Sequence, residues 1–72
     1  MFIKENFGTR LKELRNSNGE KQDDLGAILG LKKAQISEME NGHATTTLEK
    51  LVLICEHYQV SADYLLGLSN EP

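Results

Sequence analysis

The sequence lacks any long apolar run, and its 72 residues include one cysteine and one proline. The longest apolar stretch, LVLIC at 51–55, is far shorter than the roughly 20 residues that a membrane-spanning helix needs. The start, MFIKEN, lacks the apolar segment of a secretion signal, so we expect a cytoplasmic protein without a membrane partner. Cys55 has no second cysteine for a disulfide and cannot hold a metal alone. A chain of this length allows a single domain.

The residues that catalysis and metal binding require are scarce or badly spaced. Cys55 and His57 are two positions apart in a helical pattern, so they face different ways and cannot act as a nucleophile and its base. No spacing of histidine and cysteine matches a zinc site, and the glycines form no loop that could cradle a phosphate. We therefore expect no enzyme activity, no cofactor and no metal. His43 and His57 are expected at the surface, and Cys55 as a small apolar filler of the core.

Positive charge is confined to one part of the chain. The net charge is −3, yet seven of the eight lysines and arginines lie within residues 4–33. Residues 41–72 carry one positive and four negative charges. Binding to an anionic polymer depends on a local basic face rather than on the charge of the whole chain. The net charge therefore does not exclude such a partner.

Apolar residues recur at helical spacing along almost the whole chain, and no segment alternates as a strand would. Gly19, Gly30 and the Asn41–Gly42 pair are expected to end the first three helices. The four apolar stripes are Phe7, Leu11 and Leu14; Leu25, Ile28 and Leu29; Ile36 and Met39; and Leu48, Leu51, Val52, Cys55 and Tyr58. The pattern predicts an all-α protein.

Two further helix starts are predicted from capping residues. Thr46 and Glu49 have the spacing of a capping box at the start of the fourth helix. Ser61 precedes a short fifth helix in ADYLLG and is expected to cap it. We predict a compact bundle of five short helices that forms one domain over residues 1–72, with its core at about 6–67.

The second and third helices are joined by a very short turn around Gly30 and Leu31. Two helices held at a sharp angle by a three- or four-residue turn with glycine form a helix-turn-helix. The runs FGTRLKELRNSNG, KQDDLGAILGLKKAQISEMENG and TLEKLVLICEHYQVSADYLLG together resemble the Cro/repressor-type helix-turn-helix family, also called XRE-like. The resemblance covers residues 7–67. It implies a lambda-repressor-like DNA-binding domain that regulates transcription, usually as a repressor.

The resemblance also implies how DNA would be bound. A symmetric dimer would bind a palindromic operator in double-stranded DNA, with the third helix in the major groove and the second across the phosphate backbone. Gln22 matches the position of a phosphate contact, and Asn41 lies where the chain after the third helix meets the backbone. The candidate DNA contacts are Lys21, Gln22, Lys32, Lys33, Ala34, Gln35, Ser37, Glu38 and Asn41. Arg15 and Glu40 match a family salt bridge between the first and third helices.

The helical wheel agrees with this placement of the third helix. At about 100° per residue, Ile36 and Met39 fall on one side together with Lys32. The positions on the opposite side carry short polar or small side chains that would not block entry into a groove about 12 Å wide. These positions are Ala34, Ser37, Glu38 and Asn41. The alternative is that they are simply solvated.

Lysines stand where the family usually has a serine or threonine before the second and third helices. Without the side-chain oxygen of a cap, Lys21 and Lys32 should cost on the order of 1 kcal/mol each, and their charge opposes the helix dipole. Phosphates approaching these helix ends would instead favour the positive charge. Our hypothesis is that Lys21, Lys32 and Lys33 clamp the DNA backbone. The alternative is that they are tolerated, solvated lysines.

Two other positions raise separate questions. Glu38 could accept a hydrogen bond from cytosine N4, could repel phosphates and so exclude wrong registers, or could point into solvent. Gly26 stands where the family usually has alanine, and inside a helix glycine costs roughly 1 kcal/mol relative to alanine. We predict that Gly26→Ala stabilises the domain without changing its specificity.

A surface for a partner is predicted near the C-terminal end. Leu53 lies opposite the apolar stripe of the fourth helix, and with Tyr64 and Leu68 it could form a self-complementary dimer contact. A lone exposed leucine is also ordinary and needs no explanation. The alternative function is a protein-interaction module, such as an antitoxin or an adaptor, in which a protein partner replaces DNA as the main ligand.

Overall fold

The computed structural model describes residues 1–72 and contains five α-helices and no strand. The helices are α1 (Lys4–Ser17), α2 (Gln22–Leu29), α3 (Lys33–Glu40), α4 (Leu48–Tyr58) and α5 (Ala62–Leu65). The predicted all-α fold of five helices is confirmed. None of these helices combines the length and the apolar character that crossing a membrane requires.

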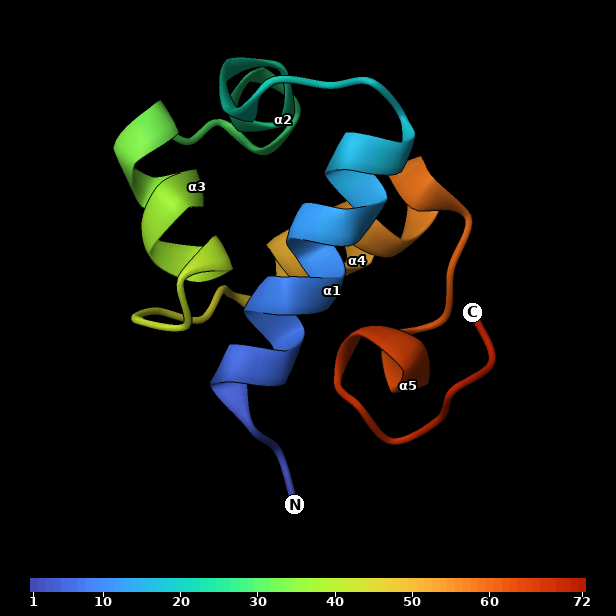
Figure 1. Ribbon diagram of the computed structural model, residues 1–72. Helices are drawn as coiled ribbons and strands as arrows, with labels where there is room; N and C mark the ends of the chain where they lie inside the picture. The colour runs from blue at the N-terminus through green and yellow to red at the C-terminus, as the bar shows by residue number, and fades with distance from the viewer.

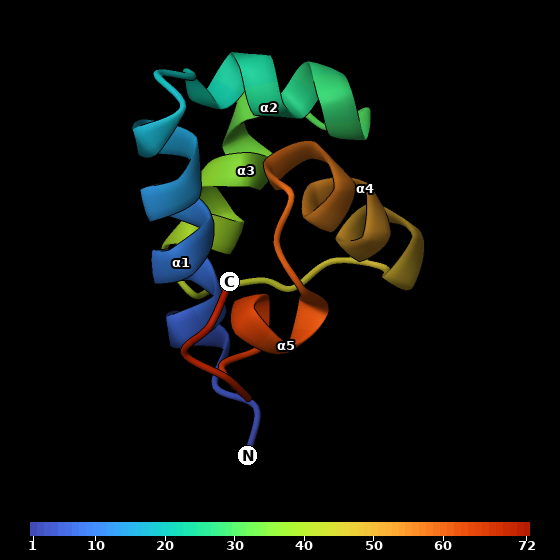
Figure 2. The same cartoon turned by 90° about the vertical axis from the view of Figure 1, so that its right-hand side faces the viewer.

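The helices pack around α1. It contacts α3 on one side and α5 on the other, and α4 packs against both α2 and α5. Figure 1 shows α1 in the middle of the molecule, with α3 and α5 on opposite sides of it. In Figure 2, α2 lies across one end of the bundle, over α3 and α4. The helix-turn-helix formed by α2 and α3 is therefore supported from behind by α1 and α4.

The core draws two buried apolar side chains from each of α1 to α4 and one from α5. The predicted stripes of α1 and α3 are buried, except that Leu14 is only half-buried. The stripe predicted for α2 is wrong at Ile28, which is 38% exposed and does not belong to the core. The buried core side chains are Phe7, Leu11, Leu25, Leu29, Ile36, Met39, Ile54, Tyr58 and Leu65.

The stripe predicted for α4 is wrong in part. Ile54 is completely buried, whereas Leu48 is 77% and Val52 55% exposed. Leu51 and Cys55 flank Ile54 as half-buried neighbours. Residues 51–55 are apolar without interruption, so their periodicity cannot tell which side of the helix faces the core. The packing of α4 against α2 and α5 determines which side faces the core.

The start of α4 also differs from the prediction. Thr47, not Thr46, is the N-cap, and its hydroxyl oxygen accepts a hydrogen bond from the amide of Lys50 at 3.2 Å. Thr46 Oγ1 is buried and has no hydrogen-bond partner in the chain. Three successive threonines leave the register of a cap open in the sequence. Ser61 caps α5 as predicted, accepting from the amide of Tyr64 at 3.1 Å.

Two buried glycines let the backbones approach closely. A Cβ added at Gly8 of α1 would lie 2.7 Å from the carbonyl oxygen of Glu40, and one at Gly26 of α2 would lie 2.5 Å from that of Leu31. Real Cβ atoms essentially never approach other atoms so closely. The prediction that Gly26→Ala stabilises the domain is therefore wrong, because the methyl group has no room beside a rigid backbone carbonyl.

Candidate nucleic-acid interface

The turn between α2 and α3 holds the two helices at a sharp angle. Gly30 ends α2 in the left-handed conformation, with φ +67°. The amide of Leu31 then donates to the carbonyl of Gly26 at 2.8 Å, and the Leu31 side chain packs against the core. Gly26 leaves space for this return of the chain. The turn is thus fastened both by a backbone hydrogen bond and by an apolar anchor.

The outer face of α3 is open to solvent. Ile36 and Met39 are buried beneath it. Of the wheel's outer residues, Ala34, Glu38 and Asn41 are exposed and Ser37 is half-buried. Lys33 and Gln35 are exposed as well, and so is Lys32, which the wheel placed on the buried side. Lys32 is the N-cap and precedes the first helical residue, so the wheel does not apply to it.

Lys21 and Lys32 are the N-cap residues of α2 and α3, but neither caps its helix with its side chain. Instead, a side chain three residues later accepts from the backbone amide of each lysine. Asp24 Oδ2 accepts from Lys21 N at 2.8 Å, and Gln35 Oε1 accepts from Lys32 N at 2.9 Å. These are one half of the capping box, and they offset part of the lost cap. Both lysine side chains remain exposed.

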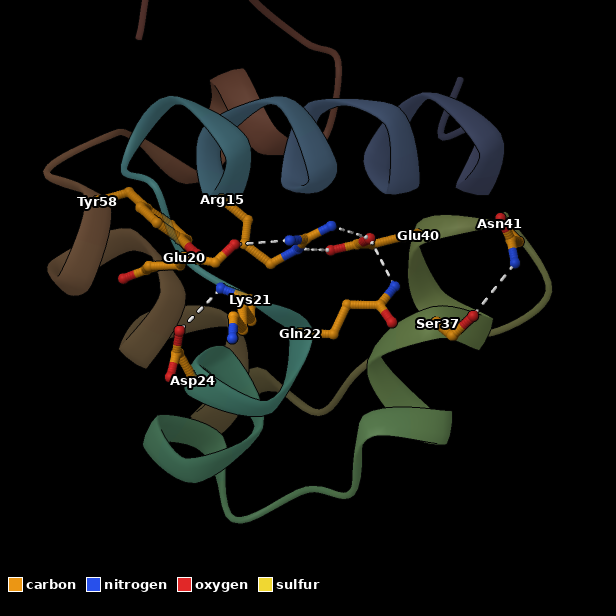
Figure 3. Close-up of polar contacts among 9 residues, drawn as sticks. All are labelled: Arg15, Glu20, Lys21, Gln22, Asp24, Ser37, Glu40, Asn41 and Tyr58. Carbon is orange, nitrogen blue, oxygen red and sulfur yellow. Dashed lines mark hydrogen bonds and ion pairs between the residues drawn. The ribbon is translucent and has the colours of Figure 1, made fainter.

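A buried ion pair fixes α3 against α1 (Figure 3). Arg15 Nε lies 2.6 Å from Glu40 Oε2, and Arg15 Nη2 lies 3.0 Å from Glu40 Oε1. Arg15 is 7% and Glu40 6% exposed. The hydrogen bond to Glu40 raises the pKa of Arg15 above its ordinary value. The pairing expected from the resemblance is present in the structure, and its two parallel hydrogen bonds set the position of α3 relative to α1.

Gln22 joins the same group from α2. Its Nε2 donates to Glu40 Oε1 at 3.1 Å, which ties the start of α2 to the end of α3 (Figure 3). One side-chain N–H of Gln22 is used in this way, and the second remains available to an acceptor. On α3, Asn41 Nδ2 donates to Ser37 Oγ at 3.4 Å. Gln22, Ser37 and Asn41 are thus held by side-chain hydrogen bonds.

A second polar cluster, around Glu20, has no counterpart in the sequence analysis. Its carboxylate accepts from the hydroxyl of Tyr58 at 2.6 Å, and its other oxygen lies 2.5 Å from Nε2 of His57. The backbone carbonyl of Glu20 accepts from Arg15 Nη1 at 2.7 Å. His57 was expected at the surface but is half-buried. Because Glu20 and Tyr58 lie far apart in the chain, no local pattern could have predicted their contact.

Glu38 lies beside the loop that follows α3. Its Oε2 is 3.3 Å from Nδ1 of His43, and both side chains are more than half exposed. An exposed pair of this kind contributes little to stability. The carboxylate stands on the solvent side of α3 without any buried partner.

The predicted dimer residues do not gather in one place. Leu68, which is 62% exposed, lines an apolar groove of about 290 Å³ together with Leu48 and Leu51. Tyr64 lies in a separate polar groove beside Arg10, and Leu53 lines neither groove. The residues around the apolar groove are Phe2, Phe7, Thr45, Thr46, Thr47, Leu48, Leu51, Leu66 and Leu68.

Known proteins are similar to this chain in sequence, and solved structures are similar to it in fold. A helix-turn-helix family model matches residues 11–65. The chain is 33% identical over 63 residues to an uncharacterised HTH-type transcriptional regulator, YobD, of Bacillus subtilis (strain 168), covering 88% of this chain and 56% of the relative. It is 32% identical over 74 residues to the control protein C.SmaI of Serratia marcescens, covering 99% of this chain and 88% of the relative.

Among solved structures, the P22 c2 repressor in complex with a synthetic operator superposes with a TM-score of 0.78 at 30% identity, covering 83% of this chain and 91% of that one. The chain belongs to the helix-turn-helix family of DNA-binding transcriptional regulators, which is not a family of enzymes. The family expected from the sequence motifs is confirmed. The chain spans about half the length of YobD.

Proposed function

We propose that this chain represses transcription by binding a palindromic operator as a homodimer, with α3 of each copy in the major groove. The observation that carries the proposal is the outer face of α3, where small and polar side chains stand clear of the body of the protein. The buried pair of Arg15 and Glu40 holds this face rigidly. The P22 c2 repressor, solved with a synthetic operator, supports the same reading.

The N-terminal ends of α2 and α3 would contact the phosphate backbone of the DNA. Lys21, Lys32 and Lys33 are exposed at the N-termini of α2 and α3, where the helix dipole also favours an anion. The free side-chain N–H of Gln22 adds a neutral donor beside them. These contacts position the protein on the duplex, and the bases are read by the face of α3.

Base reading would involve Lys33, Ala34, Ser37 and Glu38. A lysine can donate to the acceptors of guanine, and a small apolar side chain can contact the methyl group of thymine. We assign Glu38 to cytosine, because its carboxylate has only the exposed His43 as neighbour and can still accept from cytosine N4. Asn41, at the end of α3, would contact the backbone there.

A single copy offers few base contacts, since α3 is only eight residues long. Two copies related by a two-fold axis would read two half-sites about 34 Å apart. The apolar groove beside Leu48 and Leu68 is the surface that we assign to this pairing, in place of Leu53. Pairing on DNA would also raise the affinity through a linked second binding event.

Selection of bound DNA from a random pool tests the proposal. We expect a palindrome to be selected, and the isolated chain to bind it with a slope of log K against log salt of about −5, as for six phosphate contacts. The control is the same duplex with one half-site scrambled. Equal affinity for both duplexes, or a slope near zero, would contradict the proposal. Binding only in the presence of another protein would favour the interaction-module alternative.

A further inference from the structure

Arg10 of α1 is outside the set of candidate DNA contacts, and its guanidinium binds the C-terminal segment. Nη1 donates to the carbonyl oxygens of Tyr64 and Ser69, the latter at 2.7 Å, and Nη2 donates to Asn70 Oδ1 at 3.0 Å. The guanidinium carbon lies 4.3 Å from the centre of the Tyr64 ring, a cation–π geometry. No carboxylate pairs with Arg10. The arginine therefore binds two backbone carbonyl oxygens and the side-chain amide of Asn70, all of them neutral acceptors, and no negative charge.

The segment after α5 depends on this arginine for its position. Gly67, with φ +78°, turns the chain after α5, and the amide of Leu68 donates to the carbonyl of Asp63 at 2.8 Å. Beyond Leu68, every hydrogen bond to another element is made with Arg10. Chain ends with so few attachments fray once these are lost. Arg10 thus ties the segment after α5 to α1, through its hydrogen bonds to Ser69 and Asn70.

This segment forms part of the wall of the apolar groove. Leu68 lines it together with Leu48, which is 77% exposed, whereas Arg10 does not reach it. None of the residues that line the groove is charged. In a two-fold contact, side chains near the axis meet their own copies, so any charge there would face the same charge. An uncharged apolar lining therefore fits a second copy of this chain.

We infer that Arg10 is a positioning residue for self-association. By fastening residues 67–70 to α1, it holds Leu68 at the groove on which the second copy docks. This inference rests on the homodimer of the proposed function and adds the residue that shapes its surface. Because Arg10 is not among the candidate DNA contacts, its loss weakens pairing and leaves the binding of one copy to one half-site unchanged.

Analytical ultracentrifugation of the full chain measures the pairing directly. We expect Arg10→Ala to raise the dimer dissociation constant about tenfold or more, which is about 1.4 kcal/mol, while the affinity for a single half-site stays within about twofold. Arg10→Lys should behave almost like Arg10→Ala, because an ammonium lacks the fork that spans several acceptors. The matched control is Lys12→Ala, which removes the same charge from an exposed position of α1 and should resemble wild type.

A backbone heteronuclear NOE measurement on the same variants reports the segment itself. In Arg10→Ala we expect the values of Leu68 and Asn70 to fall while those of α2 and α3 stay unchanged.

Should Arg10→Ala not fold, Asn70→Ala removes one acceptor of Arg10 and should weaken the dimer about twofold to threefold. An Arg10→Ala dimer as tight as that of wild type overturns the role of Arg10 alone. A wild-type chain that stays monomeric on its palindrome overturns the proposed dimer and this inference with it.

Discussion

At the scale of single residues, the absence of a side chain at Gly26 has a clear structural purpose. Gly26 lies on the buried side of α2 and faces the carbonyl oxygen of Leu31. That carbonyl belongs to the turn that sets the direction of α3. A larger residue would push the turn away from α2. In Gly26→Ala, the gain in helix propensity competes with a steric clash between the new methyl group and the backbone carbonyl of Leu31. Backbone atoms move aside less readily than the end of a flexible side chain.

We expect Gly26→Ala to destabilise the chain by about 1 kcal/mol, since overpacking costs about 1–3 kcal/mol and alanine regains about 1 kcal/mol of helix propensity. For a domain of this size, such a change lowers the melting temperature by about 4–8 °C. Thermal unfolding followed by circular dichroism measures it. Ala27→Gly, at the exposed neighbouring position, calibrates the propensity term. A melting temperature of Gly26→Ala above that of wild type would contradict the steric argument.

Tyr58 makes the free energy of unfolding depend on pH in the alkaline range. Burial, and then the hydrogen bond to Glu20, raise its pKa far above the ordinary value of 10.0. Below about pH 10 the hydroxyl is protonated in both the folded and the unfolded chain, so its contribution is constant. Above that pH the unfolded chain loses the proton and the folded chain keeps it. The free energy of unfolding should then fall by up to about 1.4 kcal/mol per pH unit.

Urea unfolding at pH 8 and at pH 11 tests this dependence on Tyr58. Cys55 adds to the same trend, because burial raises the pKa of its thiol above 9.0. Tyr58→Phe should be less stable at pH 8, since Glu20 loses a donor, and should lose less stability on going to pH 11. A variant with the same fall as wild type would show that Tyr58 is not responsible.

At the scale of elements, the helix-turn-helix combines a firmly anchored α3 with helix starts that lack a side-chain cap. The buried pair of Arg15 and Glu40 anchors α3, whereas Lys21 and Lys32 weaken the starts of α2 and α3 by standing where a capping oxygen would be. The acceptors on Asp24 and Gln35 recover part of that loss. Helix ends of this kind are well suited to receive a phosphate, which would supply the missing acceptor.

We expect Lys32→Ser to raise the stability of the free chain by about 0.5–1 kcal/mol through a restored cap. The same change should reduce the salt slope of operator binding by about one unit per copy, since each phosphate contact contributes about 0.9. Urea unfolding and binding titrations at several salt concentrations measure the two effects. Lys12→Ala removes an equal charge away from the helix-turn-helix and should leave the slope unchanged. An unchanged slope in Lys32→Ser would remove Lys32 from the clamp.

At the scale of the whole molecule, the bundle separates two surfaces. One is the outer face of α3 with the lysines beside it, and the other is the uncharged groove between α1, α4 and the end of the chain. Leu48 and Leu53 lie on the same helix but only Leu48 lines the groove. Both are exposed, at 77% and 42%, so they provide a matched pair of variants for testing the proposed self-association surface.

We expect Leu48→Ser to weaken binding to the palindrome about tenfold while leaving binding to one half-site unchanged, since it removes an apolar contact worth about 1–2 kcal/mol. Leu53→Ser should bind both duplexes like wild type. Electrophoretic mobility shifts on the two duplexes measure the difference. The reverse result, with only Leu53→Ser impaired, would restore the surface predicted from the sequence.

The sequence by itself determined the helices, the turn at Gly30 and the family, because periodicity, capping residues and short motifs act within a few residues of one another. It also indicated the outer face of α3, since one helical wheel suffices for that. The tertiary structure alone decided that Ile54 rather than Leu48 enters the core, that Gly26 has no room for a methyl group, that Glu20 receives Tyr58, and that Arg10 holds the end of the chain. The space at Gly26 is closed by the nearby turn at Leu31, whose path is set by the packing of α3. The other three depend on which distant segment lies opposite, and contacts between distant segments leave no local pattern in the chain.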